Sequence, residues 1–541
     1  MKAHALLAVI LPFILKAWCN PVNRYATTVK IDSGVISGTT RTTSSTSTET
    51  TVVQYLGVPF AAPPVRFEPP QRPEPWQGIY DASAYKPTCI QKFDYPEDAR
   101  NRSIKWFSTP PPPVGESEDC LYLNVYVPAG AVSRAKPKAV MFWIYGGGFD
   151  FGSGALPSYD GSSFAANQDV IIVTFNYRTN VFGFPGSPQI PREQQNLGFL
   201  DQRLALDWVQ RNIHAFGGDP QRVTIFGESA GAGSVDALIT APPEPIPFSA
   251  AIMESGQASI IPPNPSSSVS WQRLVVLANC SGTASLECIR EIPTSSLKDI
   301  VERHALKFFP VHDGGATWAD KPRIDRRKST PQNSRIARVP ILMGTNADDG
   351  SAFVYGALDV KKYLDTVLPP NTPAESINKV LTEYPVGSPG ILDANGQLSK
   401  IYTDLAFQCP TAVVSVESAA VGIPTWRYYY NASFANSELF PGSGVAHSTE
   451  IGPVFGTYPR HRATPFQREL SATMQKIWAD FAKNPTQGPG WKSVPEVAVL
   501  GGGARPGESD VGRREVATIN ARRIDQRCWL YKPLFDLVSL V

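Results

Sequence analysis

A serine with glycine two positions before it and two positions after it constrains this chain more than any other feature. The segment is Gly227-Glu228-Ser229-Ala230-Gly231, and it directly follows the apolar run 223–226 (VTIF). Where a strand turns abruptly into a helix, side chains two before and two after the serine would collide, and glycine has none. Such a turn presents the serine hydroxyl at the carboxyl end of a sheet, where the helix N-terminus favours developing negative charge. The pattern predicts a nucleophilic serine, with a structural glycine turn as the alternative.

A second glycine-rich turn lies upstream. Residues 140–145 (VMFWIY) are apolar enough for a buried strand and end at Gly146-Gly147-Gly148. Glycine allows backbone amides to come close to a reacting carbonyl, as in the loops that complete an oxyanion hole. We therefore expect these amides near the serine, with a flexible turn as the alternative.

The base follows from the positions of the histidines, because hydrolases with this serine turn place the acid and then the histidine after the serine. The six histidines are His4, His214, His304, His312, His447 and His461. The first two precede the serine, and the next two leave only a short stretch to supply an acid. His461 lies in a basic, proline-flanked segment, whereas His447 follows the loop 441–444 (PGSG). His447 is the predicted base, and an ordinary loop histidine is the alternative.

The acid should follow a strand between the serine and the histidine. Residues 339–344 (VPILMG) predict such a strand, which leads into Asn346-Ala347-Asp348-Asp349-Gly350. One of the two aspartates is the candidate acid, and the other is expected to cap the turn before Ser351.

At this point the sequence resembles a family. Residues 216–220 (FGGDP) and 223–231 (VTIFGESAG) are similar to the signature of the type-B carboxylesterase/lipase family, the cholinesterase-like α/β-hydrolases, and residues 118–125 (EDCLYLNV) are similar to its second signature. Further matches are residues 55–61 (YLGVPFA), 66–67 (RF), 176–178 (NYR) and 196–202 (NLGFLDQ). The resemblance implies an α/β fold of the α/β-hydrolase type, with a large, mostly parallel central sheet, helices on both faces and antiparallel strands near the N-terminus. It also implies the hydrolysis of carboxylic esters.

The resemblance assigns roles to particular residues. The oxyanion hole maps to the amides of Gly147, Gly148 and Ala230, the acid to Asp349 and the base to His447. From its place beside the serine, Glu228 is expected to be a buried supporting acid rather than the base, and Glu450 is expected to be a second supporting acid. Ion pairs are implied between Arg66 and Glu118 and between Arg178 and Asp201.

Two features depart from the family pattern. The usual acid is glutamate, so the shorter Asp349 requires its turn to lie closer to the imidazole. The usual segment His-Gly-x-Glu-Ile-Pro-Tyr is here residues 447–453 (HSTEIGP), which changes the residue after the histidine from glycine to Ser448.

The N-terminus predicts a secretory signal peptide over residues 1–19. Lys2 precedes the apolar run 5–15, and Ala17-Trp18-Cys19 fits the small-x-small rule for cleavage after Cys19, with cleavage after Ala17 as the alternative. The run is too short for a membrane anchor, and no later segment reaches about 18 apolar residues. We expect a secreted protein whose residues 20–541 form a single domain.

Cleavage after Cys19 leaves six of the seven cysteines, an even number suited to disulfides. Spacing and the family resemblance suggest the pairs Cys89–Cys120, Cys280–Cys288 and Cys409–Cys528. Three Asn-x-Ser/Thr sequons, at Asn101, Asn279 and Asn431, predict N-glycans if a eukaryote makes the protein.

The charge and composition of the chain limit the classes of molecule that it is expected to bind. The formal net charge is +2, and both positive charges leave with Lys2 and Lys16 of the leader. A balanced surface argues against nucleic acid and against strong electrostatic binding to membranes. No cysteine or histidine cluster has metal-ligand spacing and no nucleotide loop is present, so we expect no metal and no cofactor, and a small-molecule or lipid ester as the substrate. The oligomeric state is not predicted.

The elements expected along the chain alternate as in one large α/β domain. Core strands are predicted at residues 140–145, 170–175, 223–226, 339–343 and 425–430, and a helix is predicted at about 200–212. Residues 29–60 are expected to form short antiparallel strands. The Thr/Ser-rich stretch 39–51 is expected to be a solvated hairpin loop, with an O-glycosylated stalk as the alternative. Proline-rich stretches at residues 110–113, 242–247 and 262–265 predict surface loops.

Three functions remain open at this stage. The first is a secreted carboxylesterase, and the second is an interfacial triacylglycerol lipase with a lid in the segment between Cys89 and Cys120. The third is a non-catalytic adhesion or binding protein, although members of that kind typically lack one triad residue. Trp106 in the same segment is a candidate for binding a choline-like cation, with packing of the loop as the alternative.

Overall fold

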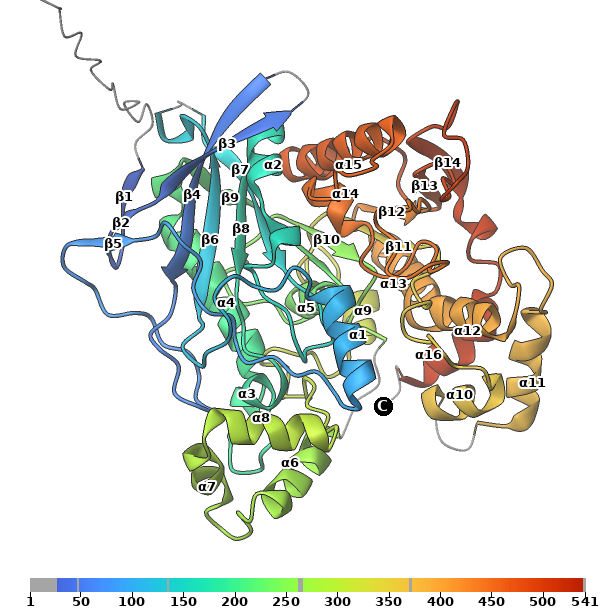
Figure 1. Ribbon diagram of the computed structural model, residues 1–541, viewed down its shortest axis with the longest axis horizontal. Coiled ribbons are helices and arrows are strands. Elements are labelled where there is room, and N and C mark those ends of the chain that lie inside the picture. The colour runs from blue at the N-terminus through green and yellow to red at the C-terminus, as the bar shows by residue number, and fades with distance from the viewer. Residues whose placement is uncertain (1–26, 46–47, 134–135, 261–265, 369–371, 539–541) are drawn as a thin grey trace, which may run out of the picture.

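A central sheet of eleven strands runs through the computed structural model, which describes residues 27–45, 48–133, 136–260, 266–368 and 372–538 (Figure 1). In their order across the sheet the strands are β14 (Val516–Asn520), β13 (Glu496–Leu500), β12 (Thr425–Tyr430), β11 (Ile341–Asn346), β10 (Ala250–Glu254), β9 (Gly218–Glu228), β7 (Lys138–Ile144), β8 (Ile171–Phe175), β6 (Tyr122–Pro128), β4 (Thr48–Pro59) and β3 (Thr39–Ser45). A separate small sheet holds β1 (Thr28–Ile31), β2 (Gly34–Ser37) and β5 (Ile79–Asp81).

The middle of the large sheet is parallel, from β8 through β7, β9, β10, β11 and β12 to β13. Antiparallel strands flank it, with β6, β4 and β3 at one edge and β14 at the other. Parallel strands covered on both faces are apolar throughout, and every residue of β7 (KAVMFWI) and β8 (IIVTF) is buried. The predicted mostly parallel sheet with antiparallel N-terminal strands is confirmed.

Helices cover both faces of this sheet. On one face α4, α5 and α13 pack against the strands, and α9 packs on α5 and α13. On the other face α2 and α15 pack against the strands, and α14 packs on α15. The helices are α1 (Glu97–Phe107), α2 (Ser162–Gln168), α3 (Asn180–Gly183), α4 (Leu197–Asn212), α5 (Ala230–Thr240), α6 (Ser266–Leu277), α7 (Ser285–Glu291), α8 (Thr294–Arg303), α9 (Pro322–Lys328), α10 (Val360–Val367), α11 (Ala374–Glu383), α12 (Ala394–Thr403), α13 (Cys409–Ala420), α14 (Ile451–Phe455), α15 (Pro465–Lys483) and α16 (Lys532–Val538). Figure 1 shows α6, α7 and α8 grouped at the bottom and α10, α11 and α12 at the right, outside the sheet layers.

The predicted core strands are all present; the one expected at 425–430 has the predicted bounds, and the other four have shifted ends. The strand expected at 339–343 begins only at Ile341, because Pro340 has no N–H for the ladder and contributes its carbonyl to Ala251 N instead. The strand expected at 223–226 runs from Gly218 to Glu228, and the predicted helix begins at Leu197 rather than near Leu200.

Most of the Thr/Ser-rich stretch 39–51 is strand rather than loop, so the predicted extent of the loop was wrong. Residues 39–45 form β3 and residues 48–51 form the first part of β4, and the two strands pair in register from Thr39 with Gln54. Threonine is β-branched and suits an extended backbone, so the composition that suggested a solvated tip fits strands equally well. The predicted leader, residues 1–19, and the loop 262–265 lie outside the described residues.

The three predicted disulfides are present, as Cys89–Cys120, Cys280–Cys288 and Cys409–Cys528. Both predicted ion pairs also form: Arg66 contacts Glu118, and Arg178 Nη2 lies 2.7 Å from Asp201 Oδ1. In the part of the chain that is described, no helix is both long and apolar enough to cross a bilayer.

Candidate active site

Ser229 stands between β9 and α5 with φ 56° and ψ −122°, a left-handed conformation that a side chain rarely adopts. A Cβ on Gly227 would lie 2.6 Å from the carbonyl oxygen of Ile144 and 2.7 Å from the carbonyl carbon of Gly231. The glycines therefore make room for each other and for β7, as the sequence pattern predicts. The bonds from Ser229 N to Glu254 O and from Gly233 N to Ser229 O, both 2.9 Å, fix the turn.

The glycine triplet after β7 lies against this serine. A Cβ on Gly146 would come within 2.9 Å of Ser229 Cβ, and Gly147 and Gly148 have φ of 102° and 62°. Among the described residues, neither the Gly147 nor the Gly148 N–H donates a hydrogen bond to a protein acceptor. Ala230 is the first residue of α5, so its N–H has no acceptor within the helix. Three backbone donors therefore lie on the glycine turn after β7 and at the start of α5, the two segments that meet at Gly146 and Ser229.

His447 and Asp349 form a hydrogen-bonded pair. The Nδ1 atom of His447 lies 2.8 Å from Asp349 Oδ1, and both side chains are buried. Asp349 Oδ2 accepts from Ser255 Oγ and from Asn346 N, each at 2.9 Å. The carboxylate is therefore held at both oxygens and fixes the orientation of the imidazole.

The neighbouring Asp348 does different work. Its Oδ2 accepts from Val445 N at 2.9 Å, and its backbone pairs with Ala446 in an isolated parallel bridge. Asp348 therefore fastens the turn after β11 to the loop that carries His447.

The other ring nitrogen of His447 faces Glu228. Nε2 lies 3.1 Å from Glu228 Oε1 but without hydrogen-bond alignment, and within the described part of the chain Nε2 has no hydrogen-bond partner. Glu228 Oε1 accepts from Ser448 Oγ at 2.7 Å. Burial lowers the pKa of His447, but the charge of Glu228 and the bond with Asp349 outweigh burial and leave this pKa above its ordinary value of 6.5.

Three buried glutamates gather behind the serine: Glu228, Glu254 and Glu450. Glu254 Oε1 accepts from Trp478 Nε1 at 2.8 Å, and Asn346 donates to Glu450. Burial raises the pKa of Glu254 to about 8, and it raises the pKa of Glu228 and Glu450 as well. The sequence did not point to Glu254, whose strand β10 is short and follows a proline-rich loop.

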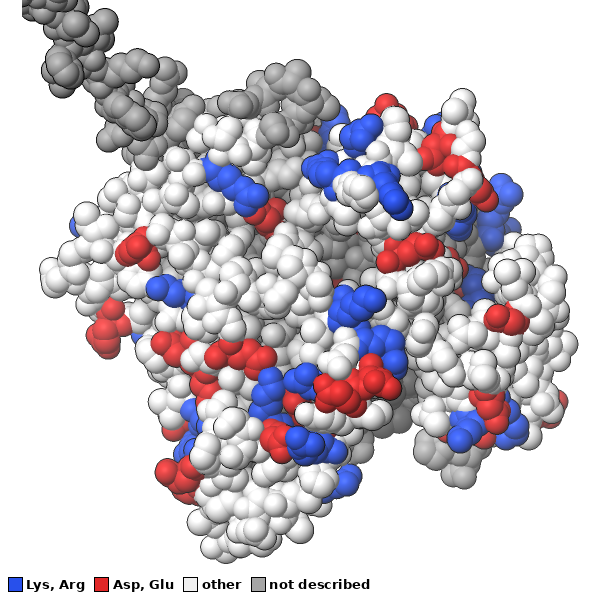
Figure 2. Space-filling view, in the orientation of Figure 1, with Lys and Arg blue, Asp and Glu red and all other residues white. Residues whose placement is uncertain are grey.

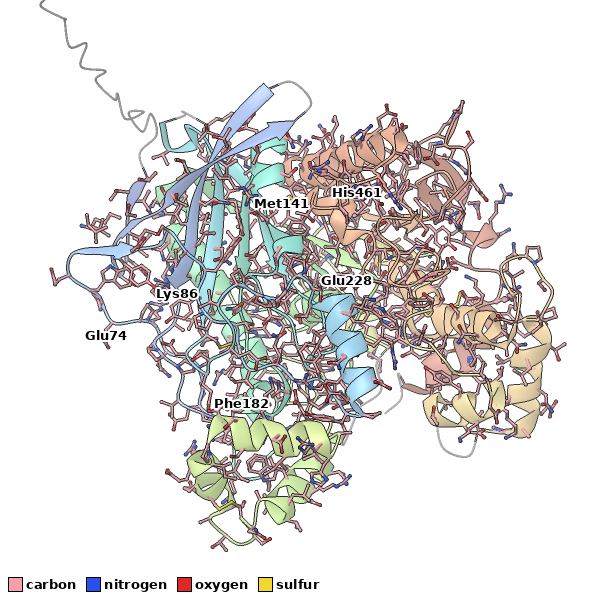
Figure 3. All side chains as sticks on the ribbon, in the orientation of Figure 1. Glu74, Lys86, Met141, Phe182, Glu228 and His461 are labelled. Atoms are coloured by element: carbon pink, nitrogen blue, oxygen red, sulfur yellow. A yellow bond between two sulfur atoms is a disulfide. The ribbon has the colours of Figure 1, made fainter. Side chains whose placement is uncertain are left out.

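Two aromatic rings that the sequence did not single out contact the imidazole. The ring centroids of Phe407 and Phe353 lie 4.7 Å and 5.1 Å from that of His447. Phe407 comes from the segment that joins α12 to α13, and 42% of Phe353 is exposed. His461, the other late histidine, is exposed, and Figure 3 shows it beside α14, well away from Glu228.

The remaining predicted positions are placed as follows. Asn101 and Asn279 are exposed, whereas Asn431 is half-buried and accepts from Arg505 Nη2 at 2.7 Å through its side chain. Trp106 packs its ring on Tyr355 and Phe440, with centroids 5.2 Å and 5.0 Å away.

Known proteins are similar to this chain over most of its length. A family model described as "Carboxylesterase family" matches residues 25–498. The chain is 33% identical over 476 residues to a cholinesterase of Mus musculus, across 81% of this chain and 77% of that protein. It is 32% identical over 474 residues to an acetylcholinesterase of Bungarus fasciatus, across 80% of this chain and 75% of that protein. It is 34% identical over 472 residues to a para-nitrobenzyl esterase of Bacillus subtilis (strain 168), across 83% of this chain and 90% of that protein.

Proposed function

The chain belongs to the carboxylesterase family and is a carboxylic ester hydrolase, and we propose that it forms its acyl-enzyme on Ser229. His447 serves as the base and Asp349 as the acid. The observation that supports this proposal is the buried 2.8 Å bond between His447 Nδ1 and Asp349 Oδ1. The other ring nitrogen of His447 lies 3.1 Å from Glu228, the residue directly before Ser229.

The proposed reaction begins when His447 Nε2 takes the proton of Ser229 Oγ and the oxygen attacks the ester carbonyl. The negative charge that develops on the carbonyl oxygen is met by the amides of Gly147, Gly148 and Ala230. His447 then gives the proton to the departing alcohol, and water releases the acid by the same steps in reverse. Asp349 holds the tautomer that leaves Nε2 free and stabilises the imidazolium.

A carboxylesterase is favoured over an interfacial lipase by the packing of the segment between Cys89 and Cys120. The ring of Phe93 stacks on Phe151 at 4.8 Å, and the backbone of Lys92 bonds to Asp150 O at 2.9 Å. At the other end of the segment, Trp106 packs on Phe440. A lid that opens at an interface would have to break these contacts. A non-catalytic binder is disfavoured, because serine, histidine and aspartate are all retained.

Secretion is also proposed, on the signal-like residues 1–19 and the three disulfides. The mature chain then begins at Asn20, forms a single domain over residues 20–541 and carries N-glycans at the exposed Asn101 and Asn279. Asn431, whose side chain is held by Arg505, is the least accessible of the three. N-terminal sequencing and mass measurement before and after glycan removal test these statements, and an uncleaved N-terminus contradicts them.

The central test is the hydrolysis of p-nitrophenyl esters from acetate to palmitate, below and above the concentration at which they aggregate. Ser229→Ala and His447→Ala should lose nearly all activity and labelling by a fluorophosphonate probe, while His461→Ala, the matched control, should keep both. More than a few per cent of residual activity in folded Ser229→Ala contradicts the proposal. A jump in rate on aggregation would favour the lipase.

A further inference from the structure

Three aromatic rings from three segments meet beside the catalytic loops. Trp106 of α1 packs on Tyr355 and Phe440, and the centroids of Tyr355 and Phe440 lie 4.7 Å apart. Tyr355 belongs to the turn that follows Asp349, and Phe440 to the loop that precedes His447. The ring cluster, defined as these three residues, therefore borders the two loops that carry the acid and the base.

The turn that carries Tyr355 also carries a ring that contacts the imidazole. Phe353 contacts the ring of His447, and Tyr355 lies two residues further along the same turn. Phe353 is 42% exposed and Tyr355 is 46% exposed, which is unusual for large rings. Figure 2 shows a hollow in the middle of the molecular surface that faces the viewer. It lies beside the upper end of α1, where Figure 3 labels Glu228.

One cation lies over this cluster. The guanidinium carbon of Arg102 is 5.2 Å from the centroid of Tyr355 and 5.7 Å from that of Trp106. Arg102 makes no ion pair with any carboxylate in the part of the chain that is described, whereas Arg100, on the same helix, contacts Glu302 at 3.6 Å. When a guanidinium stacks on aromatic rings, its N–H donors still point outward in the guanidinium plane. Two of these donors can bind the two oxygens of one carboxylate.

The acids of the adjoining loops already have partners. Glu438, two residues before Phe440, accepts from Gly442 N at 3.2 Å, and Asp348 accepts from Val445 N at 2.9 Å. The negative charges on these loops are thus engaged by backbone donors, and Arg102 is left with rings on one side and solvent on the other. The same cation covers the ring faces that a quaternary ammonium group would use.

We propose that Arg102 and the ring cluster form a subsite for the free carboxylate of a half-ester, a substrate that carries an ester at one end and an ionised acid at the other. The carboxylate binds the guanidinium fork, the apolar linker lies along Tyr355 and Phe353, and the ester carbonyl reaches Ser229. This inference rests on the proposed function, because it takes Ser229 as the reacting group.

The test compares monoethyl esters of adipic, suberic and sebacic acids with ethyl esters of monocarboxylic acids of the same length, followed by proton release. Wild type should prefer a half-ester of one linker length over its neutral partner. In Arg102→Gln the ratio of kcat/KM for the half-ester to kcat/KM for the neutral ester should decrease about fivefold or more, mainly through a higher KM for the half-ester. In Arg102→Lys this ratio should be intermediate between those of wild type and Arg102→Gln. Lys105→Gln, an exposed cation one turn along α1, is the matched control and should leave the ratio as in wild type.

Ionic strength gives an independent readout, since added salt should weaken the half-ester preference of wild type and leave that of Arg102→Gln unchanged. Equal losses for charged and neutral esters in Arg102→Gln, the same loss in Lys105→Gln, or no half-ester preference in wild type would each overturn the subsite. Absence of any Ser229-dependent hydrolysis, judged against Ser229→Ala, would instead overturn the proposed function together with the subsite.

Discussion

The Nε2 atom of His447 lies 3.1 Å from Oε1 of Glu228, so the proposed base contacts a carboxylate on the side away from Asp349. The imidazole therefore stands between two acids, and both favour its protonated form. A base in this position is strong, but it also holds its proton at a pH where an isolated histidine would have lost it. This relationship makes the pH dependence of the rate the most informative measurement.

The acid limb of the rate profile should lie above pH 6.5, because His447 must be neutral to accept the serine proton and its pKa is raised from that value. Glu228→Gln removes the larger of the favourable charges. The pKa of His447 should then fall, and the limb should move to lower pH. The measurement is kcat/KM for a short-chain ester across the neutral range.

Glu74→Gln is the control for this change, since Glu74 is exposed and Figure 3 shows it far from Glu228. Its profile should match that of wild type. A limb that stays in place in Glu228→Gln would mean that the carboxylate does not act on His447.

Substitution of the two adjacent aspartates should have very different effects on kcat. Asp349→Asn keeps the shape of the site but loses the charge and the tautomer control, so kcat should fall by roughly 10³ to 10⁴. Asp348→Asn retains an oxygen that can accept from Val445 N, so its kcat should stay within about threefold of wild type. Steady-state kinetics on both variants check this, and a larger loss in Asp348→Asn would reverse the assignment.

The burial of Glu254 should make the protein less stable as the pH rises. With a folded-state pKa of about 8, against 4.5 for the free group, the folded protein keeps a proton that the unfolded chain releases. As the pH rises from 4.5 to 8, the free energy of unfolding therefore decreases, and this decrease is complete above pH 8. Glu254→Gln can still accept from Trp478 Nε1 and carries no charge, so its stability should vary less with pH.

Thermal unfolding of wild type and Glu254→Gln across this window measures the difference. The two should be close at acid pH, and the variant should become more stable by a few kcal/mol near pH 8. Glu74→Gln again serves as the control. A gap that does not widen with pH would show that Glu254 is not protonated in the folded protein.

The steric features of the site could be predicted from the sequence. Glycine at positions 227 and 231 is dictated by the close approach of β7, and the strained backbone of Ser229 follows from the same contact. Such local requirements leave a signature of residue type and spacing. The choice of Asp349 over Asp348 came only from the family resemblance, because either residue could end the turn.

The contacts that tune the site could not be predicted. Phe353, Phe407 and Glu254 reach the histidine and the serine from segments far apart in the sequence, and nothing in their own neighbourhoods marks them. The same holds for the bond between Ser448 and Glu228, which joins residues 220 positions apart. Pairings of this kind depend on the packed sheet and are visible only in three dimensions.

Ser448 offers the last prediction, because its backbone and its hydroxyl act separately. It has φ 70°, a conformation that favours glycine, and its Oγ donates to Glu228 at 2.7 Å. Ser448→Ala and Ser448→Gly both lose the hydrogen bond, but only glycine relieves the strain. The glycine variant should therefore be more stable than the alanine variant by about 1 kcal/mol.

Both variants should also shift the rate profile in the same direction. The bond from Ser448 lowers the pKa of Glu228, so losing it leaves Glu228 less often charged and the pKa of His447 lower. The acid limb should move to lower pH in both, by less than in Glu228→Gln. Arg462, exposed and at φ 58°, provides the backbone control, since its alanine and glycine variants should differ in stability but share the wild-type profile. A profile shift confined to one of the two Ser448 variants would attribute the effect to the backbone rather than to the hydroxyl.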